Sequence, residues 1–220
     1  MGYYYGYRRR PRPEKPEHLK GDALKGRIES LRDNPNADEW TRKFCGSILE
    51  GFAKYGGLTE RQYQIFAKNE TKFSDEALQA AKDWVTSYGE AERKVAQICA
   101  KYYKANPPYF SDLADRILTD PDYVPSAKAY RAMCQNKYSV RVLAAEAAEA
   151  KYAAGSIVEL RTNARGYGHR FGPTNRGVVI RSDYGAVTAA AKGSKKYQIL
   201  PFGSPDTVTV EEREIKKVRG

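Results

Sequence analysis

The stretch Ala147-Ala-Glu-Ala-Lys-Tyr-Ala-Ala-Gly155-Ser-Ile-Val-Glu-Leu-Arg161 separates two kinds of sequence. Before Gly155 the chain is rich in alanine, which is the strongest helix former. After Gly155, β-branched residues appear, and their alternation with polar residues in 156–161 predicts a strand. The sequence therefore predicts an α+β protein with helices before Gly155 and strands after it.

Short runs with strand character continue to the end of the chain, separated by turns that carry glycine and proline. The predicted strands are 156–161, 176–181, 186–188 (a short one), 196–200, 207–210 and 214–218. Five or six short strands in so few residues are typical of a small closed barrel. We therefore expect residues 155–220 to form a β-barrel domain.

The order of these features resembles an SH3-like barrel of the KOW or Tudor kind. Gly155-Ser-Ile-Val158 resembles the first strand, and Arg176-Gly-Val-Val179 resembles the Gly-x-Val step of the second. Tyr197 to Leu200 resembles a later strand, and Val210-Glu-Glu-Arg213 precedes a closing strand. The resemblance spans residues 155–218, and it implies a partner among RNA, DNA, ribosomes, polymerases and peptides.

Residues 21–154 have the pattern of helices joined by short turns, and we predict six to eight helices in one bundle. Thr59-Glu-Arg-Gln62 is a capping box, in which the two outer side chains satisfy free backbone amides. Apolar residues four apart, such as Ile48 and Phe52, mark one face of a helix. Further predicted helix starts are Ser74, Ser111 and Ser126, and predicted helix ends are Gly56, Gly57 and Gly89.

Residues 44–68, centred on Leu58-Thr-Glu-Arg-Gln62, resemble helical segments of small uncharacterised bacteriophage proteins. Asn136-Lys137-Tyr138, before the last predicted helix, is similar to them as well. This resemblance implies a phage origin and assigns no catalytic residue.

The 38 basic and 27 acidic residues give a net charge of +11, and this charge lies mainly at the two ends of the chain. Residues 1–20 hold six basic and two acidic residues, and residues 155–220 hold twelve and six. Residues 21–154 hold 20 and 19, so they are nearly neutral. Concentrated positive charge favours a polyanionic partner, and nucleic acid is the first candidate.

Residues 1–20 are predicted to be a disordered basic tail, because Pro11, Pro13 and Pro16 are incompatible with a helix. Its arginines suit phosphates, and its tyrosines suit unpaired bases. A second basic and aromatic segment is the long, glycine-rich connection 162–175 between the first two strands. The predicted nucleic-acid-binding residues are Arg8, Arg9, Arg10, Arg12, Arg161, Arg165, Tyr167, His169, Arg170, Phe171, Arg176, Arg181, Lys192, Lys195 and Lys196.

The sequence predicts a non-enzymatic nucleic-acid-binding protein of low sequence specificity, with single-stranded DNA or RNA favoured over duplex because of the tyrosines. One alternative is an adaptor that docks on a polymerase, ribosome or other nucleoprotein through its helical domain. The other is a metal-dependent nuclease. No cofactor, metal site, catalytic residue or membrane span is predicted, and three scattered cysteines indicate a reducing, cytoplasmic compartment.

Overall fold

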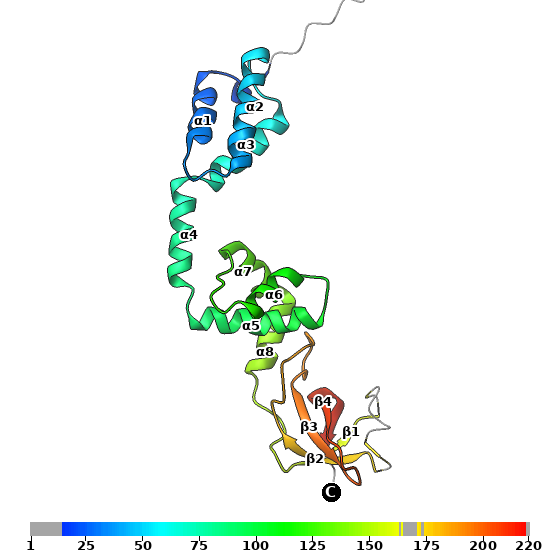
Figure 1. The fold of residues 1–220 in the computed structure, drawn as a ribbon. Helices are drawn as coiled ribbons and strands as arrows, with labels where there is room; N and C mark the ends of the chain where they lie inside the picture. Colours follow the sequence, from blue (N-terminus) through cyan, green and yellow to red (C-terminus); the bar gives the residue numbers. More distant parts are fainter. Residues whose placement is uncertain (1–14, 163, 165–170, 173, 219–220) are drawn as a thin grey trace, which may run out of the picture. The chain divides into compact units, whose positions relative to one another are not determined.

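The structure, a computed structural model, describes residues 15–162, 164, 171, 172 and 174–218 (Figure 1). This part of the chain contains eight α-helices followed by a five-stranded antiparallel sheet, which confirms the predicted α+β class. The chain divides into two compact units, Met1–Lys82 and Asp83–Gly220, which we call the N-terminal unit and the C-terminal unit.

The N-terminal unit packs three helices around one apolar core, which includes Ile28, Cys45, Ile48 and Phe66. A short 3₁₀ turn precedes them, and a fourth helix crosses into the C-terminal unit. These elements are η1 (Glu17–Leu19), α1 (Asp22–Asp33), α2 (Glu39–Tyr55), α3 (Glu60–Lys72) and α4 (Asp75–Ser87).

Most of the predicted helix boundaries are confirmed. The amide of Gln62 donates to the Thr59 hydroxyl at 3.2 Å, and the amide of Thr59 donates to Gln62 Oε1 at 2.9 Å, so the capping box at α3 is formed. Ser74 and Ser126 also cap helices through their hydroxyls. Two predictions are wrong: Ser111 is the first residue of α6 rather than its cap, and Gly89 precedes α5 instead of ending α4.

Gly57 fixes the turn between α2 and α3. Its φ is +148°, and a Cβ at this position would overlap the carbonyl oxygen of Leu19, which accepts the amide of Leu58 at 2.8 Å. We expect Gly57→Ala to lower the free energy of unfolding of the N-terminal unit by at least about 2 kcal/mol, because backbone strain and a steric overlap act together.

Hydrogen exchange of peptides from α1–α3 would measure this loss. Gly51→Ala in α2 is the matched control, since a Cβ there meets nothing within 4 Å. Alanine favours a helix interior by about 0.5–1 kcal/mol over glycine, so the control should be neutral or stabilising. Equal exchange in the two variants would contradict the role given to Gly57.

The helical part of the C-terminal unit has its own core. Cys99, Met133, Cys134 and Val142 are buried within it, and Cys45 is buried in the core of the N-terminal unit. The helices are α5 (Glu90–Ala105), α6 (Ser111–Thr119), α7 (Ala127–Cys134) and α8 (Lys137–Ala147).

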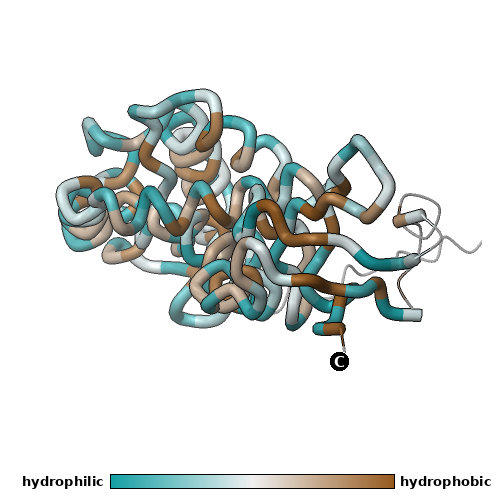
Figure 2. The backbone as a smooth tube through the Cα atoms, turned by 90° about the horizontal axis from the view of Figure 1, so that it is seen from below, coloured by the Kyte–Doolittle hydropathy of each residue, from teal (hydrophilic) through white to brown (hydrophobic). Residues whose placement is uncertain are grey.

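The sheet follows α8, and its strand order is β4-β3-β2-β1-β5 with every neighbouring pair antiparallel. Alternate residues face a core that includes Val158, Val179, Tyr197 and Ile199. Figure 2 shows the hydrophobic stretches, in brown, interrupted by hydrophilic residues along the chain. The strands are β1 (Ile157–Leu160), β2 (Arg176–Arg181), β3 (Lys196–Pro201), β4 (Val208–Glu211) and β5 (Ile215–Lys217).

The sheet is not closed into a barrel, which corrects the prediction for residues 155–220. β4 and β5 are the two edges of the sheet in the described residues, and the 3₁₀ turn η3 (Glu212–Glu214) joins them. After β4, the amides of Glu212 and Arg213 donate to the carbonyls of Lys195 and Gly193, both at 2.8 Å. Glu212 and Arg213 therefore stay bonded to the segment before β3, and β5, which follows them, pairs with β1 and not with β4.

The predicted short strand 186–188 is also absent. Val187, in the connection between β2 and β3, is buried in the core of the helices instead. The carbonyl of the next residue, Thr188, accepts a 2.9 Å hydrogen bond from Asn106 at the end of α5. The last four helices and the sheet therefore lie in one unit, and the division between units falls inside the range 21–154 that was expected to form one domain.

Candidate nucleic-acid interface

Eight of the predicted binding residues lie outside the described residues. They are Arg8, Arg9, Arg10 and Arg12 in the tail, and Arg165, Tyr167, His169 and Arg170 in the connection between β1 and β2. The remaining seven lie in the C-terminal unit, on or beside the sheet.

Phe171 is a correction to the predicted interface. Its side chain is fully buried in the core of the sheet, together with Val158 and Tyr197. A ring enclosed on all sides cannot stack on a base, so Phe171 stabilises the fold.

Lys195 is a second correction, because its side chain is only 10% exposed. The ammonium pairs with Asp183 and donates to the carbonyl of Glu146 in α8 at 3.2 Å. This lysine joins the connection between β2 and β3 to the helices, and its charge is already neutralised.

Three predicted arginines lie around the sheet with internal partners. Arg161 Nε donates to the carbonyl of Ile215 at 3.0 Å, and Arg176 lies 3.7 Å from Glu159, a carboxylate that also pairs with Lys216. Arg181 is exposed, with its guanidinium 5.5 Å from the centre of the Tyr184 ring. Of these, Arg181 retains the most accessible charge.

Lys192 and Lys196 have no acidic partner within salt-bridge distance among the described residues. Lys192 lines a groove between α8 and the connection that precedes β3, with a volume of about 540 Å³. Arg141 of α8 lines the same groove, and it too has no acidic partner in the described ranges. Small side chains form most of the floor: Ala144, Ala145, Ala148, Ala190 and Ala191. Glu212 also lines the groove, and its Oε2 accepts the Tyr197 hydroxyl and the Lys151 amide. The groove therefore presents two cations without a salt-bridge partner among the described residues, beside one carboxylate that is bonded to neutral donors.

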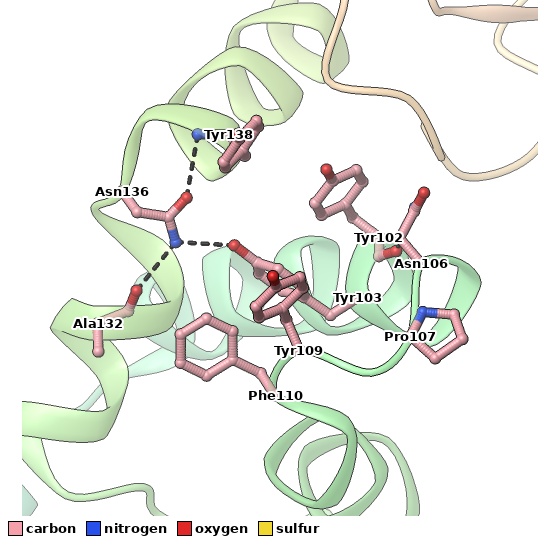
Figure 3. Close-up of a pocket in the computed structure, with 9 residues that line it drawn as sticks. All are labelled: Tyr102, Tyr103, Asn106, Pro107, Tyr109, Phe110, Ala132, Asn136 and Tyr138. Carbon is pink, nitrogen blue, oxygen red and sulfur yellow. Dashed lines mark hydrogen bonds between the residues drawn. The ribbon is translucent and has the colours of Figure 1, made fainter.

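A second concave site, the aromatic pocket, lies between α5 and α8 and has a volume of about 520 Å³ (Figure 3). Tyr109 and Tyr138 are 71% and 45% exposed, whereas Tyr102 and Tyr103 are buried at its base. Figure 3 shows Tyr138 on one side of the open space and Tyr102 and Tyr109 on the other. The remaining lining residues are Asn106, Pro107, Phe110, Ala132 and Asn136.

The inner wall of the aromatic pocket is fixed by hydrogen bonds around Asn136. Asn136 Nδ2 donates to the hydroxyl of Tyr103 at 2.8 Å and to the carbonyl of Ala132 at 2.9 Å. Its Oδ1 accepts the amides of Tyr138 and Ser139 and so caps the N-terminus of α8. Because this carboxamide is fully engaged, it holds the tyrosines in place and offers nothing to a ligand.

Other polar groups of the pocket remain available. The hydroxyls of Tyr102, Tyr109 and Tyr138 make no hydrogen bond to any described residue. Burial raises the pKa of Tyr102 above its ordinary value, so this hydroxyl is a neutral donor and acceptor at physiological pH. Among the described residues, no charged side chain lines the pocket, which leaves aromatic faces and hydroxyls as its chemistry.

The aromatic pocket and the cationic groove meet along α8. Tyr138 of the pocket and Arg141 of the groove are three residues apart and share one side of this helix. Asn106, at the edge of the pocket, bonds to Thr188 in the connection that also supplies Lys192 to the groove. Stacking surfaces and free cations are thus adjacent, which is the combination found in single-strand binding sites.

Sequence reasoning missed the tyrosines at 102, 109 and 138 and Arg141. The nearly neutral charge of 21–154 hides Arg141, because acids and bases cancel in the sum. The available signals were the runs Lys101-Tyr-Tyr-Lys104 and Pro107-Pro-Tyr-Phe110, where aromatic residues accompany basic residues and prolines.

Comparisons with protein families, with curated proteins and with solved structures find no match to this chain. Within the described ranges, no three histidine, cysteine, aspartate or glutamate side chains are grouped so that they could hold a metal ion. None of the helices in that part of the chain combines the length and the apolar character required to cross a bilayer.

Proposed function

We propose that this protein binds nucleic acid without catalysing a reaction on it, and that the C-terminal unit carries the main contact surface. The observation that supports this most is that Arg141 and Lys192 have no salt-bridge partner among the described residues and lie beside a pocket of exposed tyrosines. The net charge of +11 supplies long-range attraction to a polyanion. No recognition helix is needed for such binding, so sequence specificity is low.

The sheet is best assigned to the SH3-like class. The support is its strand order, in which β1 pairs with both β2 and β5, and the single 3₁₀ turn between the last two strands. The long connection between β1 and β2 agrees with that class as well. Three buried free cysteines fit a reducing compartment such as the cytoplasm.

We expect the double variant Arg141→Glu/Lys192→Glu to bind oligonucleotides at least about tenfold more weakly than the wild-type chain at moderate salt, because two attractive contacts become repulsive. For single strands, the slope of log K against log salt should fall by about 1.4, which is about 0.7 for each lost phosphate contact. Fluorescence anisotropy of the full-length chain with labelled oligonucleotides between about 50 and 200 mM salt measures both.

The matched control is Arg61→Glu/Lys68→Glu on the exposed face of α3, which changes the net charge equally. Equal weakening by the two double variants would mean that binding follows net charge alone and that the groove is not the contact surface. Absence of wild-type binding at physiological salt would refute the proposed function.

An adaptor is the second candidate, and the N-terminal unit supplies the observation that favours it. Trp40 is 59% exposed on α2 and is stacked parallel on Phe44, with the ring centroids 5.2 Å apart. Exposed tryptophans often anchor protein interfaces. If the wild-type chain binds no nucleic acid in the salt series, this surface becomes the leading candidate.

A further inference from the structure

The aromatic pocket has walls that the fold itself does not require. Tyr109 and Tyr138 remain largely exposed, while Tyr103 and Phe110 already close the apolar core below them, with their ring centroids 4.8 Å apart. Single exposed tyrosines are ordinary on a protein surface, but two that face each other across a preformed cavity provide flat surfaces for a ligand. The cavity volume lies in the range of small-molecule sites.

We propose that the aromatic pocket receives an unpaired base of a single-stranded nucleic acid, with the adjoining phosphates on Arg141 and Lys192. This inference rests on the proposed function and adds to it the class of substrate, single strand rather than duplex. It also assigns a binding role to Tyr102, Tyr109 and Tyr138.

The chemistry of the lining selects for an uncharged, flat group. No acidic or basic side chain from the described part of the chain lines the pocket, so a phosphate finds no partner among these residues, whereas a base can stack on a tyrosine ring. The hydroxyls of Tyr102, Tyr109 and Tyr138 both donate and accept, so they can satisfy the edge of any base. Binding at this site is therefore indifferent to sequence, in agreement with low specificity.

The charges outside the pocket determine what is attached to that base. Arg141 lies one helical turn beyond Tyr138 on the same side of α8, and Lys192 lies on the opposite wall of the adjoining groove. A flat group joined to negative charges is a nucleotide within a strand. In a duplex the bases are stacked and paired and cannot enter a cavity unless they are flipped out, so the site discriminates against duplex.

Charge also disfavours the tail of this same chain as the occupant. Residues 1–20 carry tyrosines and prolines that suit an aromatic pocket, but their six basic residues would face Arg141 and Lys192. Because like charges repel, these basic residues would oppose binding of the tail beside Arg141 and Lys192. A single strand has the opposite charge and therefore matches the whole surface.

The test uses the full-length chain and oligonucleotides of about 16 nucleotides, the upper end of single-strand site sizes. Anisotropy compares single-stranded DNA, single-stranded RNA and duplex DNA for the wild type and for Tyr109→Ala/Tyr138→Ala. We expect the variant to bind both single strands about tenfold more weakly, or worse, with duplex binding unchanged. Tyr55→Ala, at the end of α2, is the control for loss of an exposed tyrosine.

A second readout locates the base directly. Single strands that contain 5-iodouracil should photocrosslink to peptides that carry Tyr102, Tyr109 or Tyr138, and a proteolytic map by mass spectrometry identifies them. Circular dichroism of Tyr109→Ala/Tyr138→Ala checks that this variant is folded, and crosslinking of the wild-type chain stays informative if it is not.

The possible outcomes separate this inference from the proposed function. The wild-type chain could bind single strand and duplex equally, with affinity unchanged by Tyr109→Ala/Tyr138→Ala but weakened by Arg141→Glu/Lys192→Glu. That result would overturn the base pocket and leave the proposed nucleic-acid binding in place. Crosslinks confined to other peptides would overturn the base pocket as well. Absence of binding to all three oligonucleotides would overturn both, and competition by a peptide of residues 1–20 would assign the pocket to the tail.

Discussion

Tyr197→Ala should lower the free energy of unfolding of the C-terminal unit by about 3–5 kcal/mol, the range for deleting a large aromatic side chain from a core. Tyr197 is fully buried on β3, its ring packs edge-on against Tyr152 at 5.8 Å, and its hydroxyl donates to Glu212 Oε2 at 2.7 Å. Burial, followed by the bond to Glu212, raises the pKa of Tyr197, so it stays protonated and keeps donating. The variant loses the ring and leaves Glu212 Oε2 with the Lys151 amide as its remaining donor.

Urea unfolding followed by circular dichroism, with hydrogen exchange of peptides from 157–217, measures this loss. Tyr197→Phe keeps the ring and removes the hydroxyl, so it should cost about 1–2 kcal/mol. Thr209→Ala, on the exposed face of β4, should lie within about 0.5 kcal/mol of the wild type. If Tyr197→Ala were as mild as Thr209→Ala, the sheet core described above would be wrong.

Phe171→Ala is the second variant with a large expected effect. It tests whether Phe171 is a core residue or a binding residue. Phe171 is fully buried in the sheet core, so we expect a loss of about 3–5 kcal/mol in the free energy of unfolding. Thermal unfolding gives the loss, and anisotropy well below the melting temperature gives the affinity of the folded fraction. That affinity should equal the wild-type value; a stable Phe171→Ala protein with lost affinity would restore Phe171 to the interface.

Local signals explain which parts of the fold were predictable. The capping box at Thr59 and the alternation after Gly155 depend on neighbouring residues alone, so the helices and most strands appear where the sequence indicates them. Closure of the sheet and the fate of 186–188 depend on contacts between distant segments. Val187 is apolar and β-branched, which suits a strand, yet its burial partner is a helical core that precedes it by many residues.

The same distinction applies to the candidate site. Phe171 lies in a glycine-rich, basic segment, where composition alone favours a surface role, but burial of its ring is decided by the sheet that folds over it. Tyr102 and Tyr138 are distant in the sequence and become neighbours only when α5 packs against α8. Charge counted along the chain identified Lys192, whereas Arg141 acquires its role from the groove that the fold creates.

The insertion of Val187 into the helical core has a consequence for how this chain can be divided. A fragment that ends at Ala154 would lack Val187, which completes the core of α5–α8. A fragment that starts at Gly155 would contain Val187 without the helical core in which it is buried. Asn106 would lose its bond to the Thr188 carbonyl, and Lys195 would lose its bond to the Glu146 carbonyl, across the same cut. The core of the helices from α5 onward is therefore completed by a residue from the β2–β3 connection, and recombination or truncation between helices and sheet would leave that core incomplete.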